Sequence, residues 1–430
     1  MNKSDQELRL YGVYRQDKDD HFMLRVKIPA GIFTSTQAEV ICSLSKRLSN
    51  GVLHLTSRGS IEFHWLRAEH LEEIFSRLAD VGLTTRGACG GAVRGISCST
   101  TIAPGFPVVQ SVAQKLNKHF AGNPDFEGLP KKFKVGIDAG YLGARHLIQD
   151  LGFVLVDAEG KRACFDVWCA GGLGREPQSG FLLEQAVPED RLIQLVESVV
   201  QVYRENTPPP KRLKFLLNTI GEAEFRRLLK AEMTRRPCVE QPEPGSGGVL
   251  APPGTFIEFP VFAGELEADT LQLLAKIASE NSGGYLATTA DQNIALLAES
   301  ADERAALEKA CEQNNLNPGS SGTAAKFRVC PGNHECRMGL SATREIARQI
   351  IPLIKATAKD ASWAISGCSN SCSQPQLADY GIVTSKLVTD QAGCKSPLYD
   401  LYRRDDEKLG RPIAEGLSAF NLYELIGTLE

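Results

Sequence analysis

Long apolar runs are missing from this chain of 430 residues. No stretch approaches the roughly 20 consecutive apolar residues that a bilayer-spanning helix needs, and the opening "MNKSDQELRLYGVYRQDKDD" holds no apolar segment of a secretory signal. A positive surplus is also missing, since the formal net charge is −4, which argues against general nucleic-acid binding. These absences predict a cytoplasmic protein with no membrane insertion and no nucleic-acid partner.

Two cofactor patterns are missing as well. The chain has no C-x2-C-x2-C run of the ferredoxin type. It also has no glycine motif placed between a clear strand and a clear helix, where a flavin or nicotinamide dinucleotide would bind. Twelve cysteines are nevertheless present. In a reducing compartment they point to metal binding, catalysis or plain burial, because disulfide frameworks are rare there.

The chain contains an internal repeat. A stretch rich in Pro and Gly, residues 235–254, is typical of a linker. Segments before it match segments after it in the same order and at nearly constant offsets of 233, 234 and 229, which predicts a duplication. The matched pairs are "LHLTSRGSIEF" (53–63) with "LATTADQNIAL" (286–296), "VRGIS" from Val93 with "FRVCP" from Phe327, and "IQDLGFV" (148–154) with "LADYGIV" (377–383).

Local patterns in both halves indicate compact α+β units. Residues 22–28 and 256–262 alternate as strands do, and each precedes an expected helix. Apolar residues at helical spacing predict further helices over 71–78 and 213–233. The fold class is therefore predicted as α+β with internal duplication.

Four cysteines form the most specific pattern. Cys330 and Cys336 form a C-x5-C pair, and Cys368 and Cys372 form a C-x3-C pair further along the chain. Both pairs stand among Gly, Pro, Asn and Ser, which indicates loops, and four thiolates from two loops suit an iron–sulfur cluster. A structural zinc site is an alternative, although the C-x5-C spacing is wider than the pairs that zinc prefers. Simple burial of the thiols is a second alternative.

These motifs resemble the sirohaem-containing sulfite and nitrite reductases. The resemblance rests on C-x5-C followed by "GCSNSC", and it extends to "LHLTSRGSIEFHWL", "FDVWCAGGLG" and "KRLKFLLNTIGEAEF". It implies a 4Fe-4S cluster on Cys330, Cys336, Cys368 and Cys372, with Cys372 also bridging to the sirohaem iron.

The resemblance also implies an architecture. Each copy should contain a ferredoxin-like half domain and a larger α/β domain of the nitrite/sulfite reductase 4Fe-4S type, with the cluster only in the second copy. The expected boundaries are half domain 1 at 1–84, sirohaem- and anion-binding domain 1 at 85–234, the linker at 235–254, half domain 2 at 255–317, and the cluster- and sirohaem-binding domain 2 at 318–430.

Basic residues of the first copy complete the implied site. By resemblance Arg58, Arg94, Lys132 and Lys134 surround the face where the anion binds, because guanidinium groups donate in pairs and lysines supply compact charge. The cofactor-binding residues expected from the family are Cys372, Arg94, Arg328 and Asn293, with Arg86 and Lys131 as further candidates for the sirohaem carboxylates.

The repeat assigns different tasks to its copies. Projecting the cysteines backward gives Ile96, Ile102, Ala139 and Gly143, while projecting Arg58 forward gives Asp291 and projecting the two lysines gives Ala361 and Trp363. One copy thus supplies thiolates and the other supplies cations. We therefore expect Arg58 and Cys372 to lie close together with the cofactors between the copies.

The implied activity is the six-electron reduction of sulfite to sulfide or of nitrite to ammonia, with sulfite favoured. Electrons would come from an external donor such as ferredoxin or a flavoprotein subunit. Two alternatives stay open. One is an enzyme of cobalamin synthesis similar to precorrin-3B synthase, and the other is a cluster-carrying electron-transfer subunit without catalysis.

Overall fold

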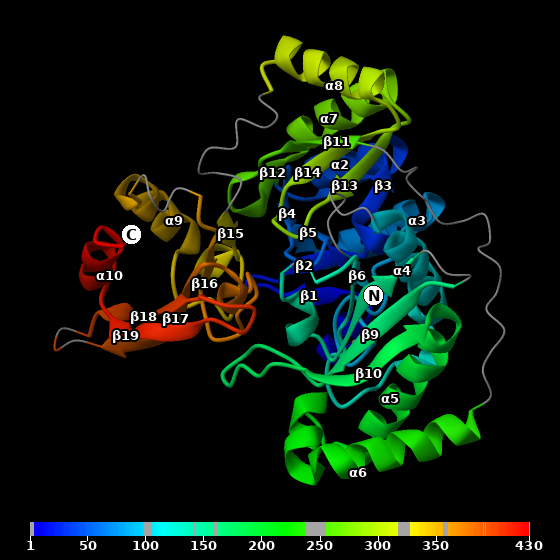
Figure 1. Ribbon diagram of the computed structural model, residues 1–430. Helices are drawn as coiled ribbons and strands as arrows, with labels where there is room; N and C mark the ends of the chain where they lie inside the picture. The colour runs from blue at the N-terminus through cyan, green and yellow to red at the C-terminus, as the bar shows by residue number, and fades with distance from the viewer. Residues whose placement is uncertain are drawn as a thin grey trace.

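A computed structural model describes residues 4–98, 105–141, 143–158, 162–236, 255–316, 327–355, 360–389, 391 and 393–429. Most of the predicted linker, and the projected Ile102, lie outside these described residues. Helices and strands alternate along the whole chain, and they build four sheets (Figure 1).

Two sheets exchange a strand between the copies. The first has the order β1 (Val13–Arg15), β2 (His21–Val26), β5 (Ile61–Arg67), β4 (Val52–Leu55) and β12 (Glu265–Glu267). The second has the order β11 (Thr255–Phe259), β14 (Ile294–Ala298), β13 (Tyr285–Thr288) and β3 (Ile32–Thr34). Strand β12 therefore closes a sheet of the first copy, and β3 closes a sheet of the second.

The exchange is antiparallel and joins one hydrophobic core. Leu266 pairs with Leu53, and Leu286 pairs with Phe33. Helices α2 (Ser35–Leu48) and α7 (Ala268–Asn281) lie side by side over these strands (Figure 1). The outer helices are α1 (Asp5–Leu10), α3 (Leu71–Asp80) and α8 (Ala301–Gln313). Because buried residues of both copies form a single cluster, the two small half domains share their core.

Corresponding turns confirm the duplication. A short 3-10 turn precedes each exchanged strand, at Pro29–Gly31 and at Phe262–Gly264. In both turns the central alanine, Ala30 or Ala263, has a φ of 56°. Such a left-handed conformation is uncommon for alanine, so its occurrence at the same place in each copy marks common descent of the two turns.

The two larger domains repeat one sheet topology. The first has the order β10 (Phe181–Pro188), β9 (Cys164–Cys169), β8 (Leu151–Asp157), β7 (Val135–Asp138) and β6 (Ser97–Cys98). The second has the order β15 (Phe327–Val329), β16 (Trp363–Ser366), β17 (Tyr380–Thr389), β18 (Lys395–Arg403) and β19 (Arg411–Leu417). In each, two parallel pairings are followed by antiparallel ones.

Helices complete each larger domain. The first contains α4 (Phe106–Phe120), α5 (Leu192–Asn206) and α6 (Leu213–Arg235), and the second contains α9 (Thr343–Ile350) and α10 (Ala419–Ile426). In Figure 1 the second sheet, in orange and red, stands beside the shared half domains, while the first, in green, lies below them. The predicted α+β fold with duplication is confirmed, and the exact domain boundaries stay a prediction.

The sheet register corrects part of the predicted repeat alignment. Gly136 pairs with Gly152 in the first copy, and Ala364 pairs with Gly381 in the second. Lys134 therefore corresponds to Ser362, and Lys132 to Asp360, instead of Trp363 and Ala361.

The register also changes the residue of the first copy to which Arg328 corresponds. This residue pairs with Ala364, as Ser97 pairs with Gly136, so Arg328 corresponds to Ser97 and not to Arg94. The prediction was wrong there because loop lengths differ between the copies, and a match of one arginine cannot fix a register.

In the part of the chain that the structure describes, none of the helices combines the length and the apolar character that crossing a membrane requires.

The shared core predicts a large effect of truncating Phe33, which is fully buried in the exchanged strand β3. Phe33→Ala removes contacts to both copies, and we expect a loss of about 3–5 kcal/mol of stability. Differential scanning calorimetry should show the first unfolding transition lowered by several degrees. Phe420→Ala is the matched control, because Phe420 is 74% exposed; similar shifts in the two variants would contradict a shared core.

Candidate active site

The four cysteines stand at one edge of the second larger sheet. Cys330 directly follows β15, and the loop with Cys368 and Cys372 follows β16. These neighbouring strands run parallel, so their carboxyl ends meet at the same edge. The loop that ends at Cys336 returns to this edge, where the Cys336 N–H donates to the Gly332 carbonyl at 3.0 Å. The topology thus brings together two pairs that are well separated in the sequence.

Glycines allow the loops to approach each other. Gly332 has a φ of 63°, and a Cβ on it would lie 2.5 Å from Thr343 Oγ1. The Gly367 N–H donates to Cys330 Sγ at 3.1 Å. Backbone donors aimed at sulfur stabilise thiolate ligands and affect the potential of the centre they bind.

The donor set fits an iron–sulfur cluster. Burial raises the pKa of the Cys330 thiol to about 12 and that of Cys336 to about 11, and the nearby Cys372 sulfur acts in the same direction on both. Gathered thiols of this kind become ligands when a metal replaces their protons. Among the described residues, no three His, Cys, Asp or Glu side chains converge as one ion would require.

A cluster of cations lies opposite the thiols. Burial lowers the pKa of the Lys132 ammonium to about 8, and Arg212 and Arg94 act in the same direction. Burial also lowers the pKa of Lys134 well below its usual value, with further contributions from Lys132 and Arg58. The Cys372 sulfur raises the pKa of both lysines. The structure therefore brings the two predicted lysines within electrostatic reach of the predicted bridging cysteine.

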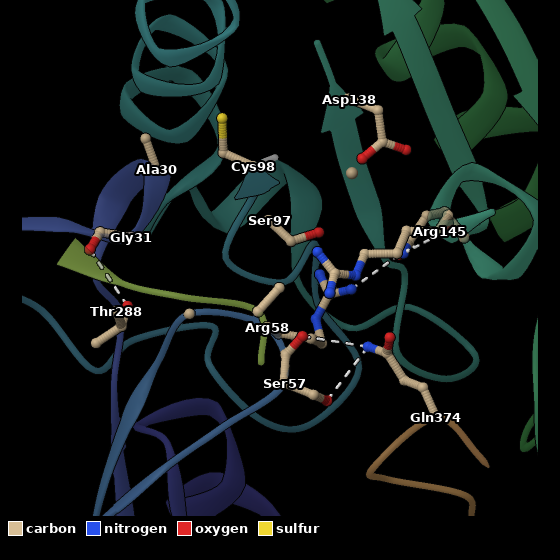
Figure 2. A pocket seen from close by; sticks show the side chains of 14 residues that line it. Ala30, Gly31, Ser57, Arg58, Ser97, Cys98, Asp138, Arg145, Thr288 and Gln374 are labelled. Carbon is tan, nitrogen blue, oxygen red and sulfur yellow. Dashed lines mark hydrogen bonds between the residues drawn. The ribbon is translucent and has the colours of Figure 1, made fainter. Parts of the chain in front are cut away.

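Direct contacts join the turn that carries Arg58 to the loop that carries Cys372. Ser57 Oγ donates to the Cys372 carbonyl at 2.8 Å. Gln374 Nε2 donates to the Ser57 carbonyl and to Ser57 Oγ, each at 3.2 Å (Figure 2). Because Ser57 and Arg58 are adjacent in the chain, Arg58 lies close to the Cys372 loop, as we expected from the sequence.

The Arg58 guanidinium is fixed by the first copy. It donates to Gln149 Oε1 at 2.8 Å, to the Gly95 carbonyl at 3.0 Å and to the Val135 carbonyl at 3.2 Å. Burial lowers its pKa to about 9, so it keeps its charge near neutral pH. Arg58, Gln149, Arg145 and Gln374 line one narrow pocket between the copies (Figure 2).

Arg94 is buried beside the same cations. It donates to the Ala88 carbonyl, and to the Gly90 carbonyl at 2.8 Å, while its Nε is buried without a hydrogen-bond partner. The guanidinium lowers the pKa values of Arg58 and Lys132. Of the further candidates, Arg86 is paired with Glu127 at 2.7 Å and Lys131 is exposed.

Two predicted cofactor residues have structural partners. Arg328 donates to Asp291 Oδ1 at 2.9 Å and to the Ser373 carbonyl at 3.2 Å, which holds it next to Cys372. Asn293 is only 1% exposed; it accepts from the Val261 N–H and donates to Glu258, both at 2.9 Å. The structure therefore engages Asn293 in holding a turn and does not bring it into the lining of the pocket.

The carboxylate of Asp291 links the copies. Its Oδ1 accepts from Arg145 of the first copy at 3.2 Å and from Arg328 of the second at 2.9 Å. Asp291 stands where the repeat projects Arg58, so the same turn carries a cation in one copy and an anion in the other.

Sequence reasoning missed Arg212 and Asp150 as a pair. Arg212 is 8% exposed, and it donates to Asp150 Oδ2 at 2.7 Å. That carboxylate also accepts from the Lys134 backbone N–H at 2.8 Å, so it positions the lysine segment. A Cβ at Gly172 would collide with the Arg212 guanidinium, so the position of Arg212 requires a glycine at this place in "FDVWCAGGLG". Asp150 recurs in the repeat, and that recurrence was the available signal.

Comparisons with known proteins identify the family of the chain. The "Nitrite and sulphite reductase 4Fe-4S domain" matches residues 98–237, and the "Nitrite/Sulfite reductase ferredoxin-like half domain" matches 14–81 and 251–314. The chain therefore belongs to the nitrite and sulfite reductase family. This confirms the predicted family and its cofactors, a 4Fe-4S cluster and sirohaem. The four cysteines lie outside the matched ranges, so their assignment as ligands stays a prediction.

Individual relatives are distant but cover most of the chain. "Sulfite reductase [ferredoxin] 2" of Mycolicibacterium paratuberculosis is 26% identical over 402 residues, covering 87% of this chain and 71% of the relative. "Ferredoxin--nitrite reductase" of Synechococcus elongatus is 26% identical over 436 residues, covering 91% and 82%. The solved structure of Mycobacterium tuberculosis NirA protein has a TM-score of 0.84 at 22% identity, covering 99% and 87%, and so shares the fold.

The buried pair predicts a specific sensitivity at Asp150. Asp150→Asn leaves the Arg212 charge buried without its counter-ion, and we expect a loss of about 3–5 kcal/mol of stability. The thermal unfolding midpoint measures this change. Asp190→Asn is the control, since its ion pair with Arg162 is partly exposed and should contribute about 0–1 kcal/mol. Equal midpoints for both variants would show that the Asp150 charge is dispensable.

Proposed function

We propose that this protein catalyses the six-electron reduction of a small oxyanion, with sulfite as the first candidate substrate and sulfide as its product. The observation that carries the proposal is the convergence of Lys132, Lys134 and Arg58 on the Cys372 loop. A buried cluster of cations beside a metal-binding thiol set suits an anion that must gain electrons and protons at one place.

The residues present fit both cofactors of the family. Cys330, Cys336, Cys368 and Cys372 would hold the 4Fe-4S cluster, and sirohaem would bind beside Cys372. The carboxylates of sirohaem need cations, and Arg94 and Arg328 would provide them. When bound, this cofactor pair would supply the electron transfer.

The first copy performs binding and charge stabilisation. Arg58 is held by three acceptors, so its guanidinium is positioned before the anion arrives and loses little freedom on binding. Lys132 and Lys134 repel each other in a half-buried space, and an anion relieves this repulsion. The same ammonium groups are candidate proton donors to oxygen atoms that leave as water, because burial shifts their pKa values toward neutrality.

Nitrite, reduced to ammonia, is the second candidate substrate. Relatives named ferredoxin–nitrite reductases match over 91–100% of this chain, at 25–26% identity. Relatives named sulfite reductase [ferredoxin] match over 84–87% at similar identity. The names of both groups include ferredoxin, and we propose a ferredoxin or a comparable one-electron carrier as the donor.

Composition tests the proposal directly. Protein purified without oxygen from cells supplied with iron and sirohaem precursors should contain about one 4Fe-4S cluster per chain, and extraction should release sirohaem. Iron and acid-labile sulfide counts with an absorption spectrum measure this. A cluster without tetrapyrrole would instead favour the cobalamin-pathway or electron-carrier alternatives, and zinc in place of iron would reject all three.

Lys132→Ala tests the role of the cations. The variant should retain both cofactors but lose about 1.5–3 kcal/mol of interaction with the anion, so kcat/KM for sulfite or nitrite should fall roughly 10- to 100-fold. Turnover with a reduced viologen dye measures the rate. Lys230→Ala on α6 is the control, because Lys230 is exposed. A Lys132→Ala variant with wild-type kcat/KM for both anions would remove the lysine from the mechanism.

A further inference from the structure

A buried ion pair lies beside one of the proposed cluster ligands. Glu335 immediately precedes Cys336, and Arg344 stands in the first turn of α9. Arg344 donates twice to this carboxylate, at 3.2 Å to Oε1 and at 2.7 Å to Oε2. The Glu335 and Arg344 side chains are 8% and 6% exposed. A bidentate pair at this depth fixes both charges close to the ligand loop.

The helix that carries the arginine is anchored to the same loop. Thr343 Oγ1, at the start of α9, donates to the Cys330 carbonyl at 2.6 Å. Arg344 also reaches Glu265 of β12, at 3.1 Å. The ion pair is therefore held between the cluster loop and the exchanged strand, and neither charge can move away from Cys336 without breaking several contacts.

The surroundings screen this pair poorly. His54 and His64 of the first copy lie near Glu335; Nδ1 of each ring is buried without a hydrogen-bond partner, and Nε2 of His64 lies 3.6 Å from the Glu62 carboxylate. Burial lowers the pKa of His54 to about 4, so that its ring is uncharged near neutral pH. Because water has little access to the Glu335 and Arg344 side chains, their charges act on a neighbouring redox centre more strongly than exposed charges would.

We propose that Glu335 and Arg344 set the reduction potential of the cluster bound at Cys336, with Glu335 lowering it and Arg344 raising it. The inference rests on the proposed function, because it requires the cluster at this site. Reduction adds one negative charge to the cluster. A carboxylate beside a ligand disfavours that charge and a guanidinium favours it, so the two residues act in opposite directions.

The signs of the two shifts in reduction potential distinguish an electrostatic role of the pair from a structural one. Removing either residue takes the same ion pair away from the cysteine loop, although without Glu335 the Arg344 guanidinium keeps its contact with Glu265 at 3.1 Å. If the pair only supported the loop, both removals would therefore disturb the cluster in the same way. An electrostatic role predicts a rise of the potential in one variant and a fall in the other.

The experiment compares Glu335→Gln with Arg344→Met in the full-length protein carrying its cofactors. Midpoint potentials are measured by redox titration, followed through the electron paramagnetic resonance signal of the reduced cluster. The expected result is a higher potential for Glu335→Gln and a lower one for Arg344→Met. Arg344→Lys keeps the charge and should return most of the way to the wild-type value.

Matched controls come from an exposed ion pair on α8. Arg304 and Glu308 are paired at 2.9 Å with 49% and 44% exposure. Glu308→Gln and Arg304→Met should leave the potential unchanged, because water screens both charges.

Each outcome decides the proposal. Shifts of the same sign in the two buried variants, or shifts no larger than those of the controls, would overturn it. If one buried variant fails to retain its cluster, the sign in the other decides; loss of the cluster in both would assign the pair to structure alone and overturn the proposal. Wild-type protein without a cluster would instead overturn the proposed function itself.

Discussion

Positive charge gathered in a partly buried space is the constraint on which this site depends. Burial lowers the pKa of Lys134, with Lys132, Arg58 and Arg212 acting in the same direction, and such a group of cations repels itself unless anions are present. Asp150 supplies one fixed negative charge, and the thiol set opposite supplies more once it is ionised by metal. The fold is thus prepared to hold anions, and the cofactor carboxylates and the substrate are the anions that the family provides.

Duplication explains how one chain builds two opposed walls. Both copies place a short turn between two strands of the half domain at the same position. In the first copy that turn carries Arg58, and in the second it carries Asp291. A single change of charge, from the Arg58 guanidinium to the Asp291 carboxylate, converts a cationic turn into one that binds Arg145 and Arg328 together. The copies could therefore diverge in charge while the backbone that positions the charges stayed the same.

The sequence predicted the fold and the centre of the site because those features rest on local signals. Alternation at 22–28 and helical spacing at 71–78 give the strand β2 and the helix α3 directly. The two cysteine pairs are recognised by their short internal spacings, which do not depend on how the two copies are aligned. Arg328 was misaligned with Arg94, because one shared arginine between loops of unequal length carries little information. Asn293 and Arg212 depended on tertiary contacts, to Val261 and Glu258 and to Asp150, which no local pattern encodes.

The exchanged strands have a consequence for synthesis on the ribosome. Strand β4 lacks its outer neighbour until β12, which belongs to the second copy, has been made, so the nascent first copy presents an open sheet edge throughout that interval. An edge of that kind invites pairing with other chains. The sheet can be completed, and the cofactors enclosed between the copies, only after the second copy has emerged. We therefore expect a truncated translation product to aggregate instead of forming a half-active fragment.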